Sequence, residues 1–311
     1  MGIFDIKSLS PMLIADRKAP FNSVDWIYEL KLDGIRVVIY KDDYRMEIRN
    51  KTGRNILPLF PELSNIYKNI HHECILDGEI IVMKDNSPSF FDIQRRVIMT
   101  NPLKIKLASQ SLPAAIVIYD IIYYKDKLVT DLPIENRKEL IKEAIQESSE
   151  IAISRYIQEL GIQLFEIAKQ NNLEGVVAKR LGSRYYFGKR SKDWVKFKNL
   201  QTEHFIICGY SVKEKNMTSL LLGQYKDHKL IYSGSVQLGV SLKDILKYGI
   251  EKTESSPFGS TNLDSNITWL KPSLVCLIEY MYKTKNNVMR LPVYKGIVKK
   301  KPEDCKVENI K

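Results

Sequence analysis

Residues 26–40 read WIYELKLDGIRVVIY, the pattern of a strand, a turn and a second strand. Apolar and aromatic residues alternate with others up to Leu30, and β-branched residues resume after Gly34, so the stretch predicts a β-hairpin. The turn nevertheless carries charges at defined positions. Lys31 ends the first strand on the same side as Asp33, and Arg36 follows the glycine. These charges raise the question of what the turn binds.

The length and charge of the chain limit the classes of protein to consider. A chain of 311 residues favours two domains, since domains commonly hold about 100 to 200 residues. The formal net charge of +11 predicts a polyanionic partner, with nucleic acid the first candidate and an anionic membrane surface the second. No apolar run reaches the roughly 18 residues of a membrane-spanning helix, and the N-terminus lacks the pattern of a signal peptide. We therefore expect a soluble, cytoplasmic protein.

Strand-like and helix-like segments alternate in groups over the first two thirds of the chain. The strand patterns cover residues 24–31, 35–40, 74–83, 114–124, 175–179 and 192–198. Helical patterns fall near residues 60–70, 134–147 and 160–171. Because several strands follow one another through short turns while helices separate the groups, the pattern predicts an α+β domain with largely antiparallel sheets.

The pattern of apolar and polar residues changes near residue 200. Short alternating segments form a meander of strands over residues 202–238, and SLKDILKYGIEK (241–252) has a helical pattern. A polar linker at residues 255–266 precedes two more strand-like segments, LVCLIEYMYK and VMRLPVYKGIV. About five strands and one helix in roughly 110 residues fit a small closed barrel such as an OB-fold. We therefore expect two domains, residues 1–200 and residues 201–311.

The motif K-x-D-G that begins at Lys31 is weak evidence alone, because roughly one chain in ten of this length contains it by chance. A solvated turn lysine is the simpler interpretation of that motif. Five further stretches favour a functional site over a solvated lysine. They are RNKTGRN (49–55), LDGEIIV (76–82), VIYDIIYY (117–124), LEGVVAKR (173–180) and RSKDWVKFK (190–198). Each places charge in or beside an apolar strand, where it is costly unless a partner or ligand compensates it. Together they predict one shared site.

The charges in these stretches are of two kinds. Hard oxygen ligands suited to a magnesium ion come from Asp77, Glu79 and Glu174. Cationic side chains suited to phosphate groups are Lys31, Arg36, Arg49, Lys179, Arg190, Lys196 and Lys198. Carboxylates beside surplus cations are typical of a site for a nucleoside triphosphate with its metal ion.

This ordered set resembles the motifs of the covalent nucleotidyltransferases, and specifically of the ATP-dependent DNA ligases. The matching segments are KLDGIR (31–36), RN (49–50), DGE (77–79), YD (119–120), EGVVAK (174–179) and WVKFK (194–198). The tail VMRLPVYKGIVKKKPEDC (288–305) resembles the motif R-x-P-x-[FY]-x-G that ends the ligase domains used in bacterial end joining. The resemblance spans nearly the whole chain, and six motifs in the family's order make it specific.

The resemblance implies an adenylation domain followed by an OB-fold domain, with Lys31 as the nucleophile that attacks ATP to form lysyl-AMP. A lysine attacks only when unprotonated, so its ordinary pKa near 10.4 must be depressed by burial and neighbouring cations. Mg²⁺, or Mn²⁺ in its place, is expected at Glu79 and Glu174. The residues expected to bind ATP are Glu29, Leu30, Arg36, Arg49, Glu79, Tyr119, Lys179, Arg190, Lys196, Lys198 and Arg290.

Some positions depart from the family's pattern or carry a less defined role. Tyr119 stands where many relatives have Phe, and it can still stack on adenine. The resemblance also assigns adenine recognition to Glu29. Asp33 is expected to orient neighbouring groups. No DNA-encircling domain precedes the nucleophile, so we expect a minimal two-domain core. The tail lacks the D-K pair that many relatives carry after the final motif, which leaves without an assigned role Lys299, Lys300 and Asp304.

The resemblance implies a monomer that binds nicked or broken duplex DNA in the bacterial nucleoid, beside a Ku-type end-binding protein and a repair polymerase, with no membrane partner. Three alternatives stay open: an RNA ligase, a capping guanylyltransferase, or a basic nucleic-acid-binding protein without catalysis. The EGVVAK form of the fourth motif argues against capping, and the OB-like tail argues against RNA ligation. A binding protein without chemistry would not need intact Lys31, Glu79, Glu174 and Lys196.

Overall fold

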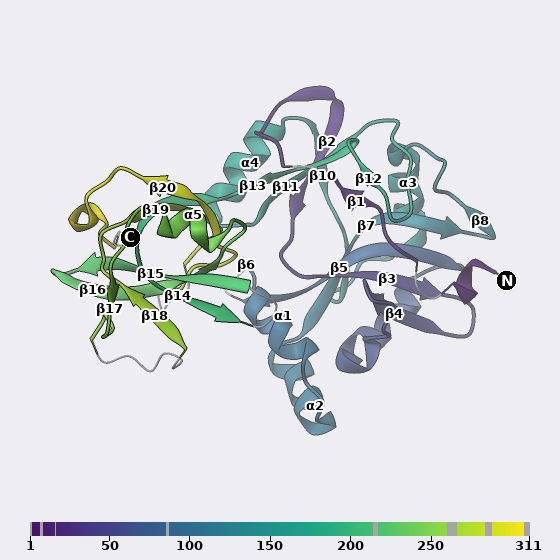
Figure 1. The fold of residues 1–311 in the computed structure, drawn as a ribbon. Coiled ribbons are helices and arrows are strands. Elements are labelled where there is room, and N and C mark those ends of the chain that lie inside the picture. Colours follow the sequence, from purple (N-terminus) through teal and green to yellow (C-terminus); the bar gives the residue numbers. More distant parts are fainter. Residues whose placement is uncertain are drawn as a thin grey trace. The chain divides into compact units, whose positions relative to one another are not determined.

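The computed structural model describes residues 2–6, 9–15, 17–84, 87–213, 217–259, 266–283 and 288–307. The chain divides into two compact units, Met1–Asn199 and Leu200–Lys311. Each unit has its own sheets, which Figure 1 shows along the colour gradient. Each unit also has its own hydrophobic core. In the described ranges, no helix is long and apolar enough to cross a membrane.

Two main sheets form the first unit. The larger has the strand order β4-β3-β5-β7-β8, with β6 paired to β5 and β9 to β7. The smaller has the order β10-β2-β11-β13, and β1 forms a separate parallel pair with β12. The strands are β1 Leu13–Ile14, β2 Ser23–Lys31, β3 Ile35–Lys41, β4 Met46–Asn50, β5 Cys74–Lys84, β6 Ser87–Pro88, β7 Ala114–Tyr124, β8 Lys127–Leu128, β9 Ile151–Ile153, β10 Tyr156–Glu159, β11 Gly175–Arg180, β12 Arg190–Ser191 and β13 Trp194–Lys198.

Helices pack against both sheets, so the predicted α+β class with largely antiparallel sheets is confirmed. The α-helices are α1 Phe90–Val97, α2 Pro102–Ser111, α3 Ile134–Ala144 and α4 Gly161–Gln170. α3 lies on β7, and α4 lies on β2 and β11. The helical pattern near residues 60–70 is a 3₁₀ segment, Pro61–Asn69, rather than an α-helix. The sequence analysis did not predict α1 and α2.

The prediction of a hairpin over residues 26–40 is wrong, although both of the predicted strands are present. β2 pairs with β10 and β11, whereas β3 pairs with β4 and β5 in the other sheet. The KLDG turn therefore crosses from one sheet to the other. Gly34 permits this crossing, because a Cβ there would collide with the carbonyl oxygen of Ile80 on β5. Lys31 consequently lies at the junction of the two sheets.

A buried arginine connects α1 to the core of the larger sheet. The Arg96 side chain is 0% exposed and forms an ion pair with Glu62 at 2.7 Å. It also donates to the carbonyl oxygens of Leu59 at 2.9 Å and Leu112 at 2.6 Å, and it lies over the ring of Phe60. Such a fully buried charge is tolerated because both terminal nitrogens of the guanidinium, Nη1 and Nη2, donate to carbonyl and carboxylate oxygens.

The second unit is an antiparallel sheet with a main apolar core and a second, smaller apolar cluster, as expected for an OB-fold. Its strand order is β16-β15-β14-β18-β17, and β14 also pairs with β19, which pairs with β20. The elements are β14 Gln201–Lys213, β15 Met217–Lys226, β16 Lys229–Gln237, α5 Leu242–Leu246, β17 Lys252–Thr253, β18 Ile267–Leu270, β19 Val275–Tyr280 and β20 Val293–Val298. The helix is shorter than the predicted 241–252, and residues 260–265 of the expected linker lie outside the described residues.

Candidate active site

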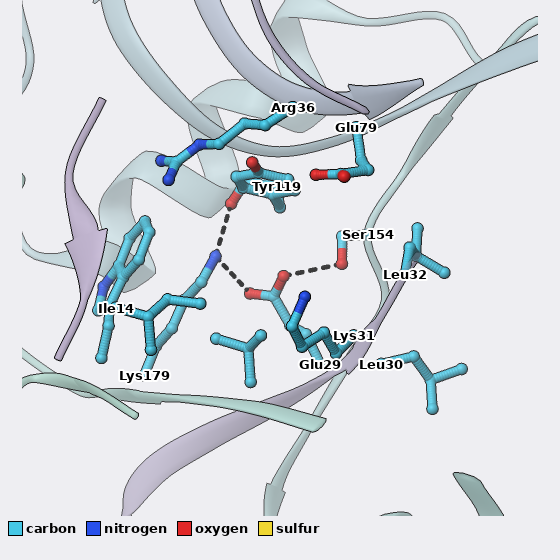
Figure 2. A pocket seen from close by; sticks show the side chains of 12 residues that line it. Ile14, Glu29, Leu30, Lys31, Leu32, Arg36, Glu79, Tyr119, Ser154 and Lys179 are labelled. Atoms are coloured by element: carbon cyan, nitrogen blue, oxygen red, sulfur yellow. Dashed lines mark hydrogen bonds and ion pairs between the residues drawn. The ribbon is translucent and has the colours of Figure 1, made fainter. Parts of the chain in front are cut away.

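A pocket of about 230 Å³ lies in the first unit, where strands of both sheets meet. Figure 2 shows the charged side chains converging on it. The lining side chains come from β1, β2, the KLDG turn, β3, β5, β7, β11 and β13, with one from the segment between β9 and β10. They are Ile14, Glu29, Leu30, Lys31, Leu32, Arg36, Glu79, Tyr119, Ser154, Val177, Lys179 and Trp194. Seven of the residues predicted to form the site are therefore brought together here: Glu29, Leu30, Lys31, Arg36, Glu79, Tyr119 and Lys179.

Lys31 is held at the pocket by the carboxylate of Glu174, the residue just before the neighbouring strand β11. Its Nζ lies 2.7 Å from Oε2 of Glu174, and Nζ of Lys198 lies 3.7 Å from Oε1 of the same carboxylate. The strand register explains this arrangement, because Gly175 is directly opposite Lys31 on one side and Lys198 on the other. A Cβ at Gly175 would collide with the carbonyl oxygen of Phe197, so glycine allows the close approach of these strands.

Arg36 is fixed by a bidentate ion pair across the larger sheet. Its Nε and Nη2 lie 3.0 Å and 2.6 Å from the two carboxylate oxygens of Asp77, which also accepts a 2.7 Å hydrogen bond from the Tyr185 hydroxyl. Burial acts most strongly and lowers the pKa of the Arg36 guanidinium, but Asp77, Tyr119 and Tyr185 together outweigh burial and raise that pKa well above its usual value. The guanidinium also lies over the ring of Tyr119 at 5.7 Å. Arg36 is thus a permanent cation in the pocket wall.

Glu29 is the centre of a buried charge cluster at the back of the pocket. Its Oε1 lies 2.7 Å from Nζ of Lys138 and 2.9 Å from Nζ of Lys179, and its Oε2 accepts a 2.7 Å hydrogen bond from the Ser154 hydroxyl. Lys179 also donates to the carbonyl oxygen of Tyr119 at 3.0 Å, as Figure 2 shows. Burial raises the pKa of the Glu29 carboxyl, but the two lysines more than offset burial and hold that pKa below its usual value. Glu29 is therefore an anion within a cationic wall.

The sequence analysis missed several residues of this wall, including Ser154 and Trp194 in the pocket and Lys138 behind it. Lys179 lies over the indole of Trp194 at 4.4 Å, which the aromatic residue of WVKFK could have indicated. Lys138 carries a second usable signal. It falls four residues after Ile134 and three before Ile141, on the apolar face of its helix.

Glu79 and Glu174 are the carboxylates predicted to bind the metal ion. Burial raises the pKa of Glu79 to about 8, against the opposing charges of Lys31 and Arg36, and the nearby Asp77 and Glu174 carboxylates raise it further. Acidic side chains crowded in this way fit a hard cation, which would relieve their repulsion. Within the described ranges, no group of three or more His, Cys, Asp or Glu side chains is arranged to hold a metal ion. A cation at this site would therefore take its remaining ligands from water and phosphate oxygens.

The predicted cations of β12 and β13 lie near the pocket but do not line it. Burial lowers the pKa of Lys196, and the neighbouring charges of Lys198, Lys31 and Arg190 lower it further. Lys196 is directly opposite Val177, which is itself opposite Glu29. The guanidinium of Arg190 donates to the carbonyl oxygen of Ile14 at 2.9 Å. These cations form an electropositive border beside Lys31.

Other predicted residues lie outside the pocket. Arg49, on β4, contacts the carboxylate of Glu47 and the carbonyl oxygen of Gly53 instead. Asp33 lies in the KLDG turn but is not among the lining residues. Arg290 belongs to the second unit, where its backbone N–H donates to the carbonyl oxygen of Tyr282 at 2.8 Å. In that unit are also Lys299, Lys300 and Asp304.

Family models match most of the chain. Residues 11–198 match the ATP dependent DNA ligase domain, and residues 213–301 match the ATP dependent DNA ligase C terminal region. The first match covers the whole pocket and the second covers most of the sheet of the second unit.

Individual relatives give the same result. The chain is 26% identical over 289 residues to the SPbeta prophage-derived DNA ligase-like protein LigB of Bacillus subtilis, covering 93% of this chain and 98% of that protein. It is also 26% identical over 317 residues to the multifunctional non-homologous end joining DNA repair protein LigD of Mycobacterium tuberculosis. That alignment covers 97% of this chain but only 40% of LigD.

Solved structures resemble both units. The ligase domain of M. tuberculosis LigD is 25% identical, with a TM-score of 0.56 over 99% of this chain and 100% of that chain. A structure of mycobacterial DNA ligase D complexed with ATP and MES is also 25% identical, with a TM-score of 0.58 over the same shares.

Proposed function

The chain belongs to the ATP-dependent DNA ligase family, and from this membership we propose that it seals duplex DNA breaks bearing a 5′-phosphate and a 3′-hydroxyl through lysyl-AMP and DNA-adenylate intermediates. The predicted family, the nucleotidyltransferase-type fold and the ATP-dependent DNA ligase activity are confirmed. We further propose that residues 1–200 form the adenylation domain and that residues 201–311 form the OB-fold domain.

One observation carries the proposed mechanism: Nζ of Lys31 lies at a pocket whose walls hold surplus positive charge. In the first step the unprotonated Lys31 nitrogen attacks the α-phosphorus of ATP, a P–N bond forms, and the bond to pyrophosphate breaks. Glu174 keeps the nitrogen directed from 2.7 Å. Arg36, Lys196 and Lys198 stabilise the charge that develops on phosphate oxygens, because cations fixed in advance need no reorganisation in the transition state.

The two later steps use the same cations. The 5′-phosphate of the break takes AMP from Lys31, which restores the free amine and leaves a pyrophosphate linkage on the DNA. The 3′-hydroxyl then attacks the 5′-phosphorus, forms the phosphodiester and releases AMP. We assign adenine recognition to Glu29 and Tyr119, with Leu30 beside them, and phosphate contacts to the cations Arg36, Arg49, Lys179, Arg190, Lys196, Lys198 and Arg290.

We propose that Glu79 and Glu174 hold a magnesium or manganese ion. When bound, that ion would offset the negative charge of the triphosphate and of the transition state. The crowded carboxylates support this assignment, since burial and neighbouring anions raise the pKa of Glu79 to about 8.

Incubation of the purified chain with ATP labelled at its α-phosphate, followed by a denaturing gel, tests the first step. We expect label to stay on the protein, to be lost on addition of pyrophosphate, and to be absent when GTP replaces ATP. Labelling by GTP alone would support a capping enzyme instead. Sealing assays on nicked DNA, nicked RNA and free duplex ends then establish the substrate.

The partners of the reaction are also proposals. The relative LigD is named for multifunctional non-homologous end joining, and this chain spans 40% of its length. We propose that the chain acts as a monomer in the cytoplasm on chromosomal breaks, beside a Ku-type end-binding protein and a repair polymerase. Addition of purified Ku to the duplex-end assay tests this, and we expect it to raise the rate of end joining without changing nick sealing.

A further inference from the structure

Lys138 is a fully buried lysine that contacts the active-site wall from outside the pocket. It lies on α3 with its side chain 1% exposed, and its Nζ is 2.7 Å from Oε1 of Glu29. Nζ of Lys179 lies 2.9 Å from the same oxygen, and Lys179 lines the pocket while Lys138 does not. One carboxylate oxygen is thus shared by two ammonium groups, of which only one faces the ligand.

The charged groups around this carboxylate oxygen carry a net positive charge. Glu29 supplies one negative charge, and Lys138 and Lys179 supply two positive charges. Asp120 is also near both lysines, but it forms a bidentate pair with Arg137 at 2.7 Å and 3.0 Å, and both of those side chains are 0% exposed. The ring of Tyr156 on β10, 5.8 Å from Nζ of Lys138, adds no formal charge. The cluster therefore keeps one net positive charge at the back of the pocket.

We propose that Lys138 is a positioning residue for ATP: by neutralising Glu29 from behind the pocket, it leaves the charge of Lys179 available to the polyphosphate ligand. This inference rests on the proposed function, because it requires an anionic nucleotide in the pocket. Without the charge of Lys138, Glu29 and Lys179 form a neutral pair, and the pocket loses one unit of positive potential. The effect is large in a buried site, where charges are weakly screened.

The proposal has a consequence for pH. Burial lowers the pKa of Lys138 to about 8, against the opposing charge of Glu29. The Lys138 amine is protonated and positively charged below its pKa, and it is neutral above it. The contribution of Lys138 to ATP binding should therefore be lost as the pH rises through about 8. An arginine at this position stays charged throughout that range.

Calorimetric titration with the non-cleavable analogue α,β-methylene-ATP tests the proposal without depending on turnover. The variants are Lys138→Met, which keeps the Glu29–Lys179 pair, and Lys138→Arg, which keeps the charge. At pH 7 we expect Lys138→Met to raise the dissociation constant about tenfold, equivalent to ~1.4 kcal/mol. The ratio to the unsubstituted chain should fall toward one at pH 9.5, where Lys138 is neutral in both. Lys138→Arg should bind as the unsubstituted chain does at pH 7 and more tightly at pH 9.5.

The control is Lys142→Met on the same helix, where Lys142 is 51% exposed and pairs with Glu139. It should leave the dissociation constant unchanged at both pH values, and thermal unfolding of every variant checks the fold. A Lys138→Met effect that is equally large at pH 7 and pH 9.5 would mean general damage to the pocket, and no effect at pH 7 would remove the role altogether. Either result overturns the proposal. If the unsubstituted chain binds the analogue but forms no lysyl-AMP with ATP, the proposed function fails independently.

Discussion

Nζ of Lys31 lies 2.7 Å from Oε2 of Glu174, with Gly175 directly opposite Lys31 on the adjacent strand. The pair joins the ends of two strands in the smaller sheet, at the point where the chain crosses to the larger sheet. This junction explains why K-x-D-G and E-G-V-V, which lie more than a hundred residues apart, meet at one pocket. Backbone pairing therefore places both the proposed nucleophile, Lys31, and a predicted metal ligand, Glu174.

We expect Lys31→Ala to abolish formation of lysyl-AMP while leaving the fold intact. The side chain of Lys31 is 22% exposed and lines the pocket, so its removal costs little packing. Labelling with α-labelled ATP measures the loss, and circular dichroism checks the fold. Lys169→Ala is the matched control, because Lys169 is exposed on α4 in the same unit and should label normally. Labelled Lys31→Ala protein would show that another residue is the nucleophile.

Glu174→Ala and Glu79→Ala should each lower the rate of nick sealing by about two orders of magnitude or more, because each removes a carboxylate from the site of the cation. Raised magnesium or added manganese should restore part of the rate for the residue that binds metal directly, since mass action refills a weakened site. Sealing rates measured against metal concentration give the result. If neither variant responds to metal, ligation is the wrong role for both residues.

Arg96→Met should destabilise the first unit by about 3 to 5 kcal/mol, because it leaves the largely buried Glu62 carboxylate without its counter-charge and removes the buried donors of Arg96. Arg96 is 0% exposed, pairs with Glu62 and donates to three carbonyl oxygens. Its neighbour Arg95 is 53% exposed and supplies the control, since Arg95→Met should change stability by less than about 1 kcal/mol. Urea denaturation monitored by fluorescence compares the two. Similar midpoints would contradict the structural role of Arg96.

Binding to a nicked duplex should fall steeply with salt, because a chain of net charge +11 that contacts phosphates releases counterions from DNA. With six or more phosphate contacts, the loss of affinity between roughly 50 and 200 mM salt is about a thousandfold. Fluorescence anisotropy at several salt concentrations measures the slope. Affinity that is constant over this range would argue against a phosphate-dominated interface.

The types of residue that form the site were largely predictable from the sequence, whereas the pairing of the strands that carry them was not. Strand periodicity records which side chains are buried, but it does not record which strand lies alongside, so β2 and β3 were expected to pair and do not. Lys138 shows a similar limit. A lysine on the apolar face of a helix signals burial, but only the folded structure, in which Lys138 of α3 reaches Glu29 of β2, reveals its partner.

Residues of the second unit were harder to assign. The RLPVYKG stretch predicted a functional arginine by resemblance, and the structure describes Arg290 within its own unit only. It is the one arginine in residues 200–311 of the sequence, which makes it a clean target for substitution. Lys243, exposed on α5 of the same unit, supplies a control cation.

We expect Arg290→Ala to slow self-adenylylation by about 2 to 4 kcal/mol in activation free energy, as for loss of a preorganised transition-state cation. By the family resemblance, Arg290 acts on the β- and γ-phosphates, and these exist only before the first step. Sealing of a nick that already carries AMP should therefore be far less affected, and Lys243→Ala should change neither rate. Single-turnover labelling with ATP and single-turnover sealing of pre-adenylylated DNA separate the two steps. Equal losses in both would mean that the second unit only clamps DNA, because a residue that contacts the leaving pyrophosphate cannot influence a step from which pyrophosphate is absent.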